Sequence, residues 1–408
     1  MSGTILAQRY DALFLDLDGV LYRGDRAVPA APRVVRDLRE RHVRIVFLTN
    51  NSARMPEQVA EKLLGLGIEA EPEEVLTSAL ATAAMLRRGG RPGQTAFVIG
   101  ERGVREALSQ AGVELLDGEP ERSDLVVVGW DRSADYAKLR TASLLVQRGA
   151  RLIATNDDAA YPAPDGLWPG AGALLAAVIT TTGASPTIVG KPARPLFEAA
   201  AEAVGAAHPL VVGDRIETDI AGASAMGWDS LLVLSGAADR GDLLTADVLP
   251  TCVAPDLTAL LEDRRPARFR PAGEGDAAAV QRLLESSGLG PIPGAGGRTQ
   301  TVVSTGPDGD VEATATLQDV DGDGLLRAVA VRQELRGAGL GVLAVAAAIQ
   351  RGRERGITRV YLFTETAEAF FRRLGFEPID RDRLPESVRM GPQAEECASA
   401  VAMAISLG

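Results

Sequence analysis

The sequence "YDALFLDLDGVLYRG", residues 10–24, decides how the first part of this chain folds. Its apolar run brings two carboxylates, Asp16 and Asp18, to its end, and the run stops at Gly19. A short apolar run bounded by an Asp-Gly turn predicts a buried β-strand. The two acids are either turn residues or a nucleophile with its acid/base partner. The choice between these interpretations depends on the remainder of the chain.

The length and composition predict a globular protein of two or three domains. The chain has 408 residues, and domains usually hold about 100 to 200 residues each. Hydrophobic residues make up 46% and charged residues 24%, which is ordinary for a soluble protein. No apolar run approaches the about 20 residues that span a bilayer, and the first residues do not resemble a secretory signal. We therefore expect a cytoplasmic protein without a membrane partner.

The net charge and the rare residue types exclude several kinds of site. The net charge is −12, whereas binding to a nucleic-acid backbone needs basic patches, so we expect no nucleic-acid partner. The chain has two cysteines and two histidines, Cys252, Cys397, His42 and His208. These are too few for a disulfide framework, a thiolate metal cluster, a histidine metal site or a Ser-His-Asp triad. Catalysis would therefore rest on carboxylates, lysine, threonine or the backbone.

Short β-rich runs alternate with helical patterns over residues 10–260. This alternation predicts an α/β fold with a parallel, Rossmann-like sheet. The predicted strands are "ALFLD", "RIVFLT", "TAFVIG", "DLVVVGW", "RLIAT", "TIVG", "PLVVGD" and "SLLVL". Residues 263–271, "DRRPARFRP", are charged and contain two prolines, which indicates a linker before a second folded unit.

Residues able to carry chemistry follow four of the predicted strands. They are Asp16 and Asp18 after the first, Thr49 after "RIVFL", Lys191 after "TIVG", and Asp214 with Asp219 after "PLVVG". In open α/β sheets, ligands bind at the carboxyl ends of the strands where the strand order reverses, so we expect these side chains to share one crevice. Four carboxylates in one crevice cannot all stay ionised without a cation. Oxygen ligands suit a hard metal ion, and we expect Mg²⁺.

The motifs "DLDGV", "LTNNS", "GKP" and "GDRIETD", in this order, resemble the four motifs of the haloacid dehalogenase-like (HAD) phosphohydrolases over residues 10–260. The resemblance implies that Asp16 attacks phosphorus and forms an aspartyl-phosphate. It implies that Asp18 protonates the leaving alkoxide and then deprotonates the attacking water. It also implies that Thr49 hydrogen-bonds a phosphoryl oxygen and that Lys191 neutralises charge on the transferring group.

The same resemblance implies a set of metal ligands. The Asp16 carboxylate, the Asp18 backbone carbonyl and Asp214 would hold Mg²⁺. Asp219 would complete the metal site by orienting Lys191 or a metal-bound water. An ordinary acidic residue at a helix N-terminus is the alternative for Asp219.

Three asparagines are predicted to bind the substrate: Asn50, Asn51 and Asn156. The alternative for the first two, together with Thr49, is a helix N-cap, which is compatible with phosphate binding because both use amides at the start of a helix. The alternative for Asn156, and for its neighbour Asp157, is an ordinary turn.

The spacing of the motifs predicts an inserted domain. The interval between Thr49 and Lys191 is long enough to hold one, whereas the interval between Asp18 and Thr49 is not. We expect the insertion to be an α/β cap that closes over the site. The predicted boundaries are a HAD core at 1–77 and 184–262, the cap at 78–183, the linker at 263–271 and a last domain at 272–408.

The last domain carries the sequence "LLRAVAVRQELRGAGLGVLAVAAAIQRGRERG", residues 325–356. It resembles the acyl-CoA site of GCN5-related N-acetyltransferases (GNAT), an α+β family. The resemblance implies that acetyl-CoA binds at Arg336, Gly337, Gly339 and Gly341, whose backbone amides can approach a pyrophosphate. Many members carry a proton-donating Tyr where this chain has Phe371. A second enzyme, a CoA-sensing module and an inactive module that serves packing or homodimer formation are therefore three alternatives.

The sequence therefore predicts a Mg²⁺-dependent phosphatase of a small phosphorylated metabolite. The fusion to a GNAT-like domain is similar to actinobacterial glycerol-3-phosphate phosphatases, which makes glycerol 3-phosphate the leading substrate. Phosphoglycolate, pyridoxal phosphate and nucleotides are alternative substrates, because the fold hosts all of these activities. A CoA-binding protein or N-acetyltransferase with the HAD core as its regulatory partner is the alternative function.

Overall fold

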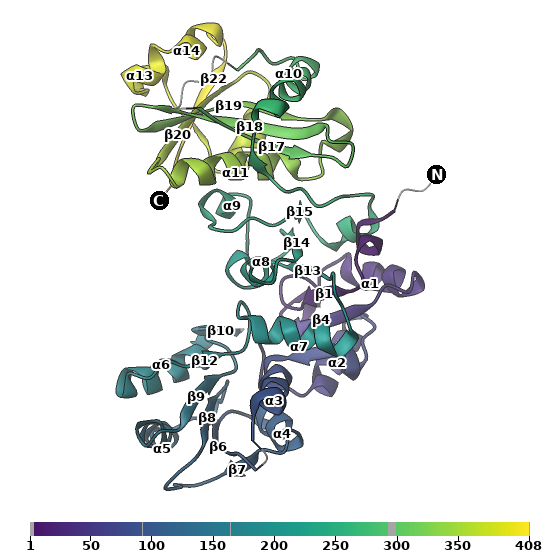
Figure 1. Cartoon of the computed structure of the whole chain (residues 1–408), viewed down its shortest axis with the longest axis vertical. Coiled ribbons are helices and arrows are strands. Elements are labelled where there is room, and N and C mark those ends of the chain that lie inside the picture. The colour runs from purple at the N-terminus through teal and green to yellow at the C-terminus, as the bar shows by residue number, and fades with distance from the viewer. Residues whose placement is uncertain (1–3, 92, 164, 293–298, 408) are drawn as a thin grey trace. The chain divides into compact units, whose positions relative to one another are not determined.

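The computed structural model in Figure 1 describes residues 4–91, 93–163, 165–292 and 299–407. The chain folds into two compact units: Met1–Gly236 with Asp256–Asp263, and Ala237–Pro255 with Arg264–Gly408. Among the described residues, the first unit contains two large parallel sheets and the second unit contains one mixed sheet. The observed architecture confirms the predicted fold class, a Rossmann-like core with an inserted α/β cap and a C-terminal α+β domain.

The core sheet of the first unit is built around β1. Its strands are β1 (Leu13–Asp16), β4 (Ile45–Thr49), β5 (Val75–Thr77), β13 (Leu210–Gly213) and β14 (Asp229–Val233). They are parallel and lie in the order β14-β13-β1-β4-β5. Leu13 pairs with Ile45 of β4 on one side and with Leu210 of β13 on the other. The strand order thus reverses at β1, and the carboxyl ends of β1, β4 and β13 meet there.

Helices cover both faces of this sheet, as a parallel sheet requires. They are α1 (Ala31–Glu40), α2 (Pro56–Gly65), α7 (Arg194–Val204) and α8 (Ala221–Met226), with short turns at Leu6–Arg9, Pro72–Glu74 and Leu257–Leu261. Phe14 is fully buried and meets Trp228 edge-on at 5.6 Å between ring centroids. A small hairpin, β2 (Tyr22–Arg23) and β3 (Arg26–Ala27), follows β1 directly.

The insertion forms the second parallel sheet. Its strands, in spatial order, are β12 (Thr187–Ile188), β9 (Arg151–Ala154), β8 (Leu125–Val128), β6 (Thr95–Ile99) and β7 (Glu114–Leu116). Helices α5 (Tyr136–Gln147) and α6 (Ala171–Thr182) cover one face, and α3 (Ser78–Gly89) and α4 (Arg102–Gln110) lie on the other (Figure 1). A hairpin of β10 (Ala160–Ala163) and β11 (Gly166–Pro169) precedes α6. Strand β12 extends this sheet to Ile188, past the predicted cap boundary at Gly183.

The mixed sheet of the second unit has the order β16-β17-β18-β19-β20-β22-β21. The strands are β16 (Arg270–Pro271), β17 (Thr299–Thr305), β18 (Val311–Val320), β19 (Asp323–Val331), β20 (Arg359–Thr364), β21 (Glu377–Pro378) and β22 (Val401–Ser406). The pair β19 and β20 is parallel, and the other pairs are antiparallel. The long helix α11 (Leu340–Arg353) packs on the sheet through a largely buried apolar surface.

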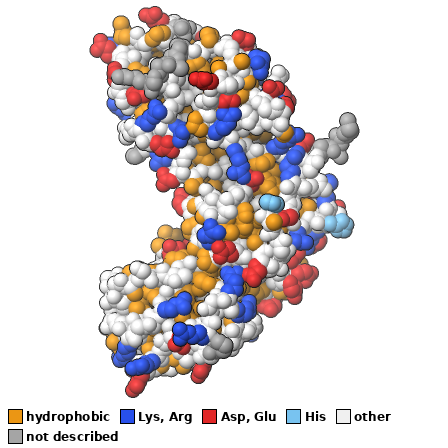
Figure 2. Space-filling view, viewed as in Figure 1, with side chains coloured by type: hydrophobic (Ala, Val, Ile, Leu, Met, Phe, Trp, Pro, Cys, Tyr) orange, Lys and Arg blue, Asp and Glu red, His pale blue; other side chains and the backbone are white. Residues whose placement is uncertain are grey.

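Several shorter elements complete the second unit. They are α9 (Asp242–Thr245), β15 (Cys252–Ala254), α10 (Ala277–Ser286), α12 (Glu368–Arg372), α13 (Glu386–Arg389), α14 (Pro392–Glu396) and turns at Glu274–Asp276, Gln333–Leu335 and Arg381–Arg383. Figure 2 shows acidic and basic side chains interspersed over the visible face of each unit. In the part of the chain that the structure describes, no helix is both long and apolar enough to cross a membrane.

Candidate active site

The carboxyl ends of the core strands bring the predicted HAD residues together. Asp16 is the last residue of β1, Thr49 is the last residue of β4, and Asp214 follows β13. Asp219 lies on a single π-helical turn, Ile216–Ile220, a feature that is frequent at functional sites. Lys191 follows β12, and it lines a cleft of about 160 Å³ together with Asp16, Asp18, Thr49, Asn50, Asn51, Asn156 and Asp219.

Lys191 is the central cation of the cleft floor. Its side chain is buried and forms ion pairs with Asp16 and with Asp219, the latter at 2.6 Å. Burial alone would lower the pKa of Lys191, but Asp16 and Asp219 raise it above its ordinary value. The ammonium therefore stays charged at every physiological pH.

Three carboxylates lie close to one another here, and two of them pair with that ammonium. Carboxylate oxygens of Asp16, Asp214 and Asp219 lie within 4.8 Å of one another. Burial, together with the charges of Asp219 and Asp214, raises the pKa of Asp16 to about 7 against the lowering effect of Lys191. One lysine cannot balance three acids, so the site as built favours a further cation.

The packing around Asp214 fits a bound Mg²⁺. A Cβ at Gly19 would lie 2.1 Å from Asp214 Oδ2, and a Cβ at Gly236 would lie 2.0 Å from the same atom. Only glycine at these two positions leaves room for the carboxylate. The donor set consists of hard oxygen atoms, which is the chemistry that Mg²⁺ prefers. Asp16, Asp214 and Asp219 therefore fit this ion by number, charge and donor type.

Asp18 occupies the wall of the cleft next to Asp16. The chain turns directly after it, with Gly19 at φ 79° and its amide donating to the Tyr22 carbonyl at 2.7 Å. Burial raises the pKa of Asp18, while the charges of Lys62 and Arg215 act in the opposite direction. A carboxyl group with a raised pKa is suited to donate a proton.

Asn50 connects the loop after β4 to the cap-to-core segment. Its Oδ1 accepts from the Lys191 amide at 2.8 Å, and its Nδ2 donates to the Lys191 carbonyl at 3.2 Å and to Asp158 Oδ2 at 3.2 Å. Asn156 Nδ2 donates to the Asn50 carbonyl at 2.7 Å. These two asparagines line the cleft and also fix the backbone around Lys191.

Asn51 has a local partner for its side chain. Its Oδ1 accepts from the Ala53 amide at 3.0 Å and the Arg54 amide at 3.1 Å, while Thr49 Oγ1 accepts from the Asn51 amide at 3.1 Å. The Asn51 oxygen thus stabilises the turn that leads into α2. Its predicted contact with substrate stays a prediction.

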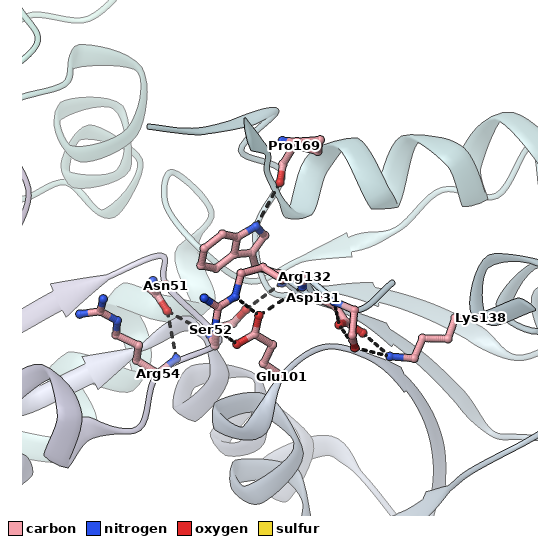
Figure 3. Close-up of polar contacts among 11 residues, drawn as sticks. Asn51, Ser52, Arg54, Glu101, Asp131, Arg132, Lys138 and Pro169 are labelled. Carbon is pink, nitrogen blue, oxygen red and sulfur yellow. Dashed lines mark hydrogen bonds and ion pairs between the residues drawn. The ribbon is translucent and has the colours of Figure 1, made fainter. Parts of the chain in front are cut away.

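The cap supplies an aromatic wall to the cleft that no sequence motif predicted. Trp130 stacks on Tyr161 at 4.2 Å between ring centroids, and its Nε1 donates to the Pro169 carbonyl at 3.0 Å (Figure 3). The Arg132 guanidinium lies over the Trp130 ring, 5.3 Å from the ring centroid, and pairs with Glu101 at 2.7 Å. The Trp130 amide donates to Ser52 Oγ at 3.2 Å, which joins the wall to the loop after β4.

Other cleft residues were also missed. They are Tyr22, Arg54, Lys62, Asp158, Tyr161 and Arg215. Arg215 lies inside the motif "GDRIETD", and Trp130 ends the predicted strand "DLVVVGW". Their positions in the sequence could therefore have predicted both as cleft residues. Nothing local in the sequence marks Lys62, which lies inside helix α2.

The glycine-rich turn of the second unit lies where the sequence predicted it, before α11, with Gly337 at φ 88° and Gly339 at φ 90°. A Cβ at Gly339 would lie 2.6 Å from the Val253 carbonyl oxygen. Arg264 Nη1 donates to that carbonyl at 3.3 Å and to the Ala338 carbonyl at 3.2 Å. The chain's own backbone therefore packs against the turn at which acetyl-CoA was predicted to bind.

Phe371 is part of the apolar core of this unit. Its side chain is buried and meets Phe370 and Phe376 edge-on, at 5.0 Å and 5.7 Å between ring centroids. It offers no proton to a leaving thiolate, as the sequence indicated.

Comparisons with known families match three segments of the chain. A family model described as haloacid dehalogenase-like hydrolase matches residues 13–114, and a second model, described as HAD-hydrolase-like, matches residues 188–260. The model of the acetyltransferase (GNAT) family matches residues 296–376.

Two curated proteins are similar to the first part of the chain. The 5'-nucleotidase YutF of Bacillus subtilis is 38% identical over 251 residues, which is 61% of this chain and 96% of that protein. The acid sugar phosphatase of Staphylococcus aureus is 36% identical over 258 residues, which is 63% of this chain and 98% of that protein.

A solved structure is similar over most of the chain. The glycerol phosphate phosphatase of Mycobacterium tuberculosis, crystallised in complex with magnesium, superposes with a TM-score of 0.71 at 29% sequence identity. The match covers 91% of this chain and 99% of that one. It therefore covers much more of the chain than the matches to the two curated relatives, which cover 61% and 63% of it.

Proposed function

The chain belongs to the haloacid dehalogenase-like hydrolases, and from that premise we propose that it is a Mg²⁺-dependent phosphatase that hydrolyses glycerol 3-phosphate through an aspartyl-phosphate. The observation that carries the proposal is the grouping of Asp16, Asp214, Asp219 and Lys191 where the strand order reverses, with Asp18 beside them. Such a grouping of acids around a buried lysine serves phosphoryl transfer, in which positioning and charge stabilisation do most of the catalysis.

In the first chemical step, a carboxylate oxygen of Asp16 attacks phosphorus, and the bond from phosphorus to the ester oxygen breaks. The carboxyl group of Asp18 gives its proton to the departing alkoxide. In the second step, the Asp18 carboxylate takes a proton from water as that water attacks the aspartyl-phosphate. Inorganic phosphate leaves and the Asp16 carboxylate is restored.

The charges around the phosphoryl group assist both steps. Lys191 neutralises part of the negative charge that spreads over the phosphoryl oxygens, and Asp16 and Asp219 hold its ammonium in place. Asp16, Asp214, Asp219 and the Asp18 carbonyl would hold Mg²⁺, which supplies positive charge to the same oxygens.

The size of the cleft supports a small substrate. Its volume of about 160 Å³ is below the ~300 to 1,000 Å³ usual for pockets that bind larger ligands. Glycerol 3-phosphate comes first because the neighbour that matches both units is a glycerol phosphate phosphatase. Phosphoglycolate, pyridoxal phosphate and nucleoside monophosphates are the alternatives, and the curated relatives include a 5'-nucleotidase and an acid sugar phosphatase.

Phosphate release by the purified full-length protein tests this proposal. The panel holds glycerol 3-phosphate and the three alternatives, each with Mg²⁺ and with EDTA. We expect release of phosphate from glycerol 3-phosphate with Mg²⁺, and we expect EDTA to abolish it. The Asp16→Asn protein should remain folded and lose at least about a thousandfold in turnover, because the substitution removes the nucleophile. Turnover of the full panel by Asp16→Asn would contradict covalent catalysis at this residue.

Acetyl-CoA binding by the second unit is the second candidate function, favoured by the match to the acetyltransferase family at residues 296–376. The Val253 carbonyl against Gly339 weighs against binding, and Phe371, which has no proton to donate, weighs against acetyl transfer. Calorimetric titration of the full-length protein with acetyl-CoA decides the matter. We expect no heat of binding at micromolar ligand, and a micromolar Kd would restore the CoA-binding alternative.

A further inference from the structure

Among the described residues, three cations that line the cleft have no carboxylate partner: Arg54, Lys62 and Arg215. Arg54, on the loop after β4, and Lys62, on α2, both line the cleft. Within the described ranges of the chain, no carboxylate oxygen lies within 4.0 Å of a side-chain nitrogen of either residue. Figure 3 shows the Arg54 guanidinium directed away from Glu101, which pairs with Arg132 instead.

The positive charges of Arg54 and Lys62 act on each other. Burial lowers the pKa of Lys62, and the nearby charge of Arg54 lowers it further, against Asp18 and Asp25. The Lys62 ammonium also lies over the Tyr22 ring, 3.6 Å from the ring centroid, which holds the side chain at the cleft. Two neighbouring cations that face a cleft and form no ion pair with a carboxylate are an arrangement that a bound anion stabilises.

The reacting phosphoryl group already has its own cation. Lys191 forms an ion pair with Asp16, the nucleophile. Lys62 instead lies over the ring of Tyr22, and Tyr22 forms a β-bridge with Asp18, the proton donor. Lys191 therefore lies on the phosphoryl side of the cleft, and Lys62 lies on the side of the leaving group. An anion between Arg54 and Lys62 would belong to the leaving group of the ester.

We propose that Arg54 and Lys62 form a second anion subsite, so that phosphomonoesters whose leaving group carries a carboxylate or another anionic group bind more tightly than esters that carry only hydroxyls. The proposal rests on the proposed phosphatase function. The aromatic wall of Trp130 and Tyr161 lines the same small cleft. The chain thus offers apolar surface to the carbon skeleton and cations to its charged end.

A matched pair of ligands tests the subsite. Glycerol 3-phosphate and 3-phosphoglycerate share a three-carbon skeleton and the phosphate ester, and differ in a hydroxymethyl group against a carboxylate. Binding is measured by calorimetry with Mg²⁺ on the Asp16→Asn protein, which binds without turnover. We expect 3-phosphoglycerate to bind at least about ten times more tightly, the order that one charge-assisted hydrogen bond supplies.

Substitution of the two cations should remove that preference selectively. In the Asp16→Asn background, Lys62→Gln and Arg54→Gln should each weaken 3-phosphoglycerate about tenfold and leave glycerol 3-phosphate within about twofold. Arg87→Gln is the matched control, because Arg87 is exposed on α3 and its loss changes the net charge equally. It should change neither affinity. Thermal unfolding midpoints check that all variants are folded.

Three results would overturn the subsite: equal affinities of the two ligands, equal losses for both ligands on substitution, or no binding of either ligand. Equal losses would mean that the cations attract only the reacting phosphate. Failure of the phosphatase function gives a different result, since wild-type protein would then release no phosphate from any ester while the binding measurement still reports on the two cations.

Discussion

Asp18 lies two residues after Asp16, and its different surroundings suit it to a different catalytic role. It is not paired with Lys191, its pKa is raised mainly by burial, and it lies near Lys62 and Arg215. We expect Asp18→Asn to preserve the turn at Gly19 and to slow hydrolysis of glycerol 3-phosphate by about a hundred- to ten-thousandfold, the range that general acid–base catalysis contributes.

The leaving group provides the measurement for Asp18. The p-nitrophenolate ion leaves without needing a proton, so the first step of p-nitrophenyl phosphate hydrolysis should survive in Asp18→Asn as a burst of p-nitrophenol. Rapid-mixing kinetics with both esters reveal the difference. An equal loss in the first step for both esters would show that Asp18 acts on the geometry of the site and not as the proton donor.

A buried acid, Asp131, lies in the turn that precedes helix α5, and its contribution to stability can be tested by pH. Asp131 Oδ1 accepts from the Ser133 amide at 2.8 Å, and Oδ2 pairs with Lys138 at 2.8 Å (Figure 3). Burial raises the pKa of Asp131, but hydrogen bonds from Lys138 and Ser133 outweigh it and hold the pKa below the ordinary 3.8. The ionised carboxylate therefore adds stability above about pH 4, and that stability is lost as the pH falls through the folded-state pKa.

Substitution of this acid should destabilise the protein in a pH-dependent way. Asp131→Asn should lower the free energy of unfolding at pH 7 by about 1 to 3 kcal/mol, because Ser133 and Lys138 lose the buried charged acceptor of their hydrogen bonds. Urea unfolding followed by circular dichroism at pH 7 and at pH 3 measures the difference between variant and wild type. We expect the difference to shrink at pH 3. A difference that is the same at both pH values would mean that Asp131 contributes by packing alone.

The catalytic part of the site was readable from the sequence because it depends on local patterns. Asp16 and Thr49 end apolar strands, and the end of a strand is marked by the residues themselves. Strand β12 was placed in the core and pairs instead with β9 of the cap. Strand β12 has only two residues, which are too few to show a hydrophobic periodicity, so the sequence pattern cannot assign it to either sheet.

Features of the site that depend on packing between distant segments could not be predicted from the sequence. Lys62 reaches the cleft through the orientation of α2, and Trp130 reaches it through the cap, about which the core motifs carry no information. The glycine turn before α11 was located correctly, but the segment that covers it, around Val253, lies far away in the sequence. Local signals predict where a turn occurs, and tertiary contacts decide what occupies it.

The cap and core of the first unit are joined around the loop that carries Asn50. The Gly103 amide donates to the Ala53 carbonyl at 2.9 Å, and the Trp130 amide donates to Ser52 Oγ at 3.2 Å. The cap helix α4 approaches the loop so closely that a Cβ at Gly103 would lie 2.6 Å from the Ser52 carbonyl oxygen and 2.7 Å from that of Arg54. Both of these carbonyl oxygens belong to the backbone, so they cannot move unless the loop moves.

Gly103→Ala should therefore displace the cap from the loop while leaving each domain folded. Overpacking of this kind costs about 1 to 3 kcal/mol, and a misplacement of about 1 Å near a catalytic site can lower the rate about a hundredfold. We expect kcat/KM for glycerol 3-phosphate to fall at least about tenfold. Gly89→Ala on α3 is the matched control, since a Cβ there meets no atom within 4 Å, and it should be neutral or slightly stabilising. Hydrogen exchange of residues 50–55 should increase in Gly103→Ala and not in Gly89→Ala. Unchanged kinetics and exchange in Gly103→Ala would show that the contact between α4 and the loop does not position the site.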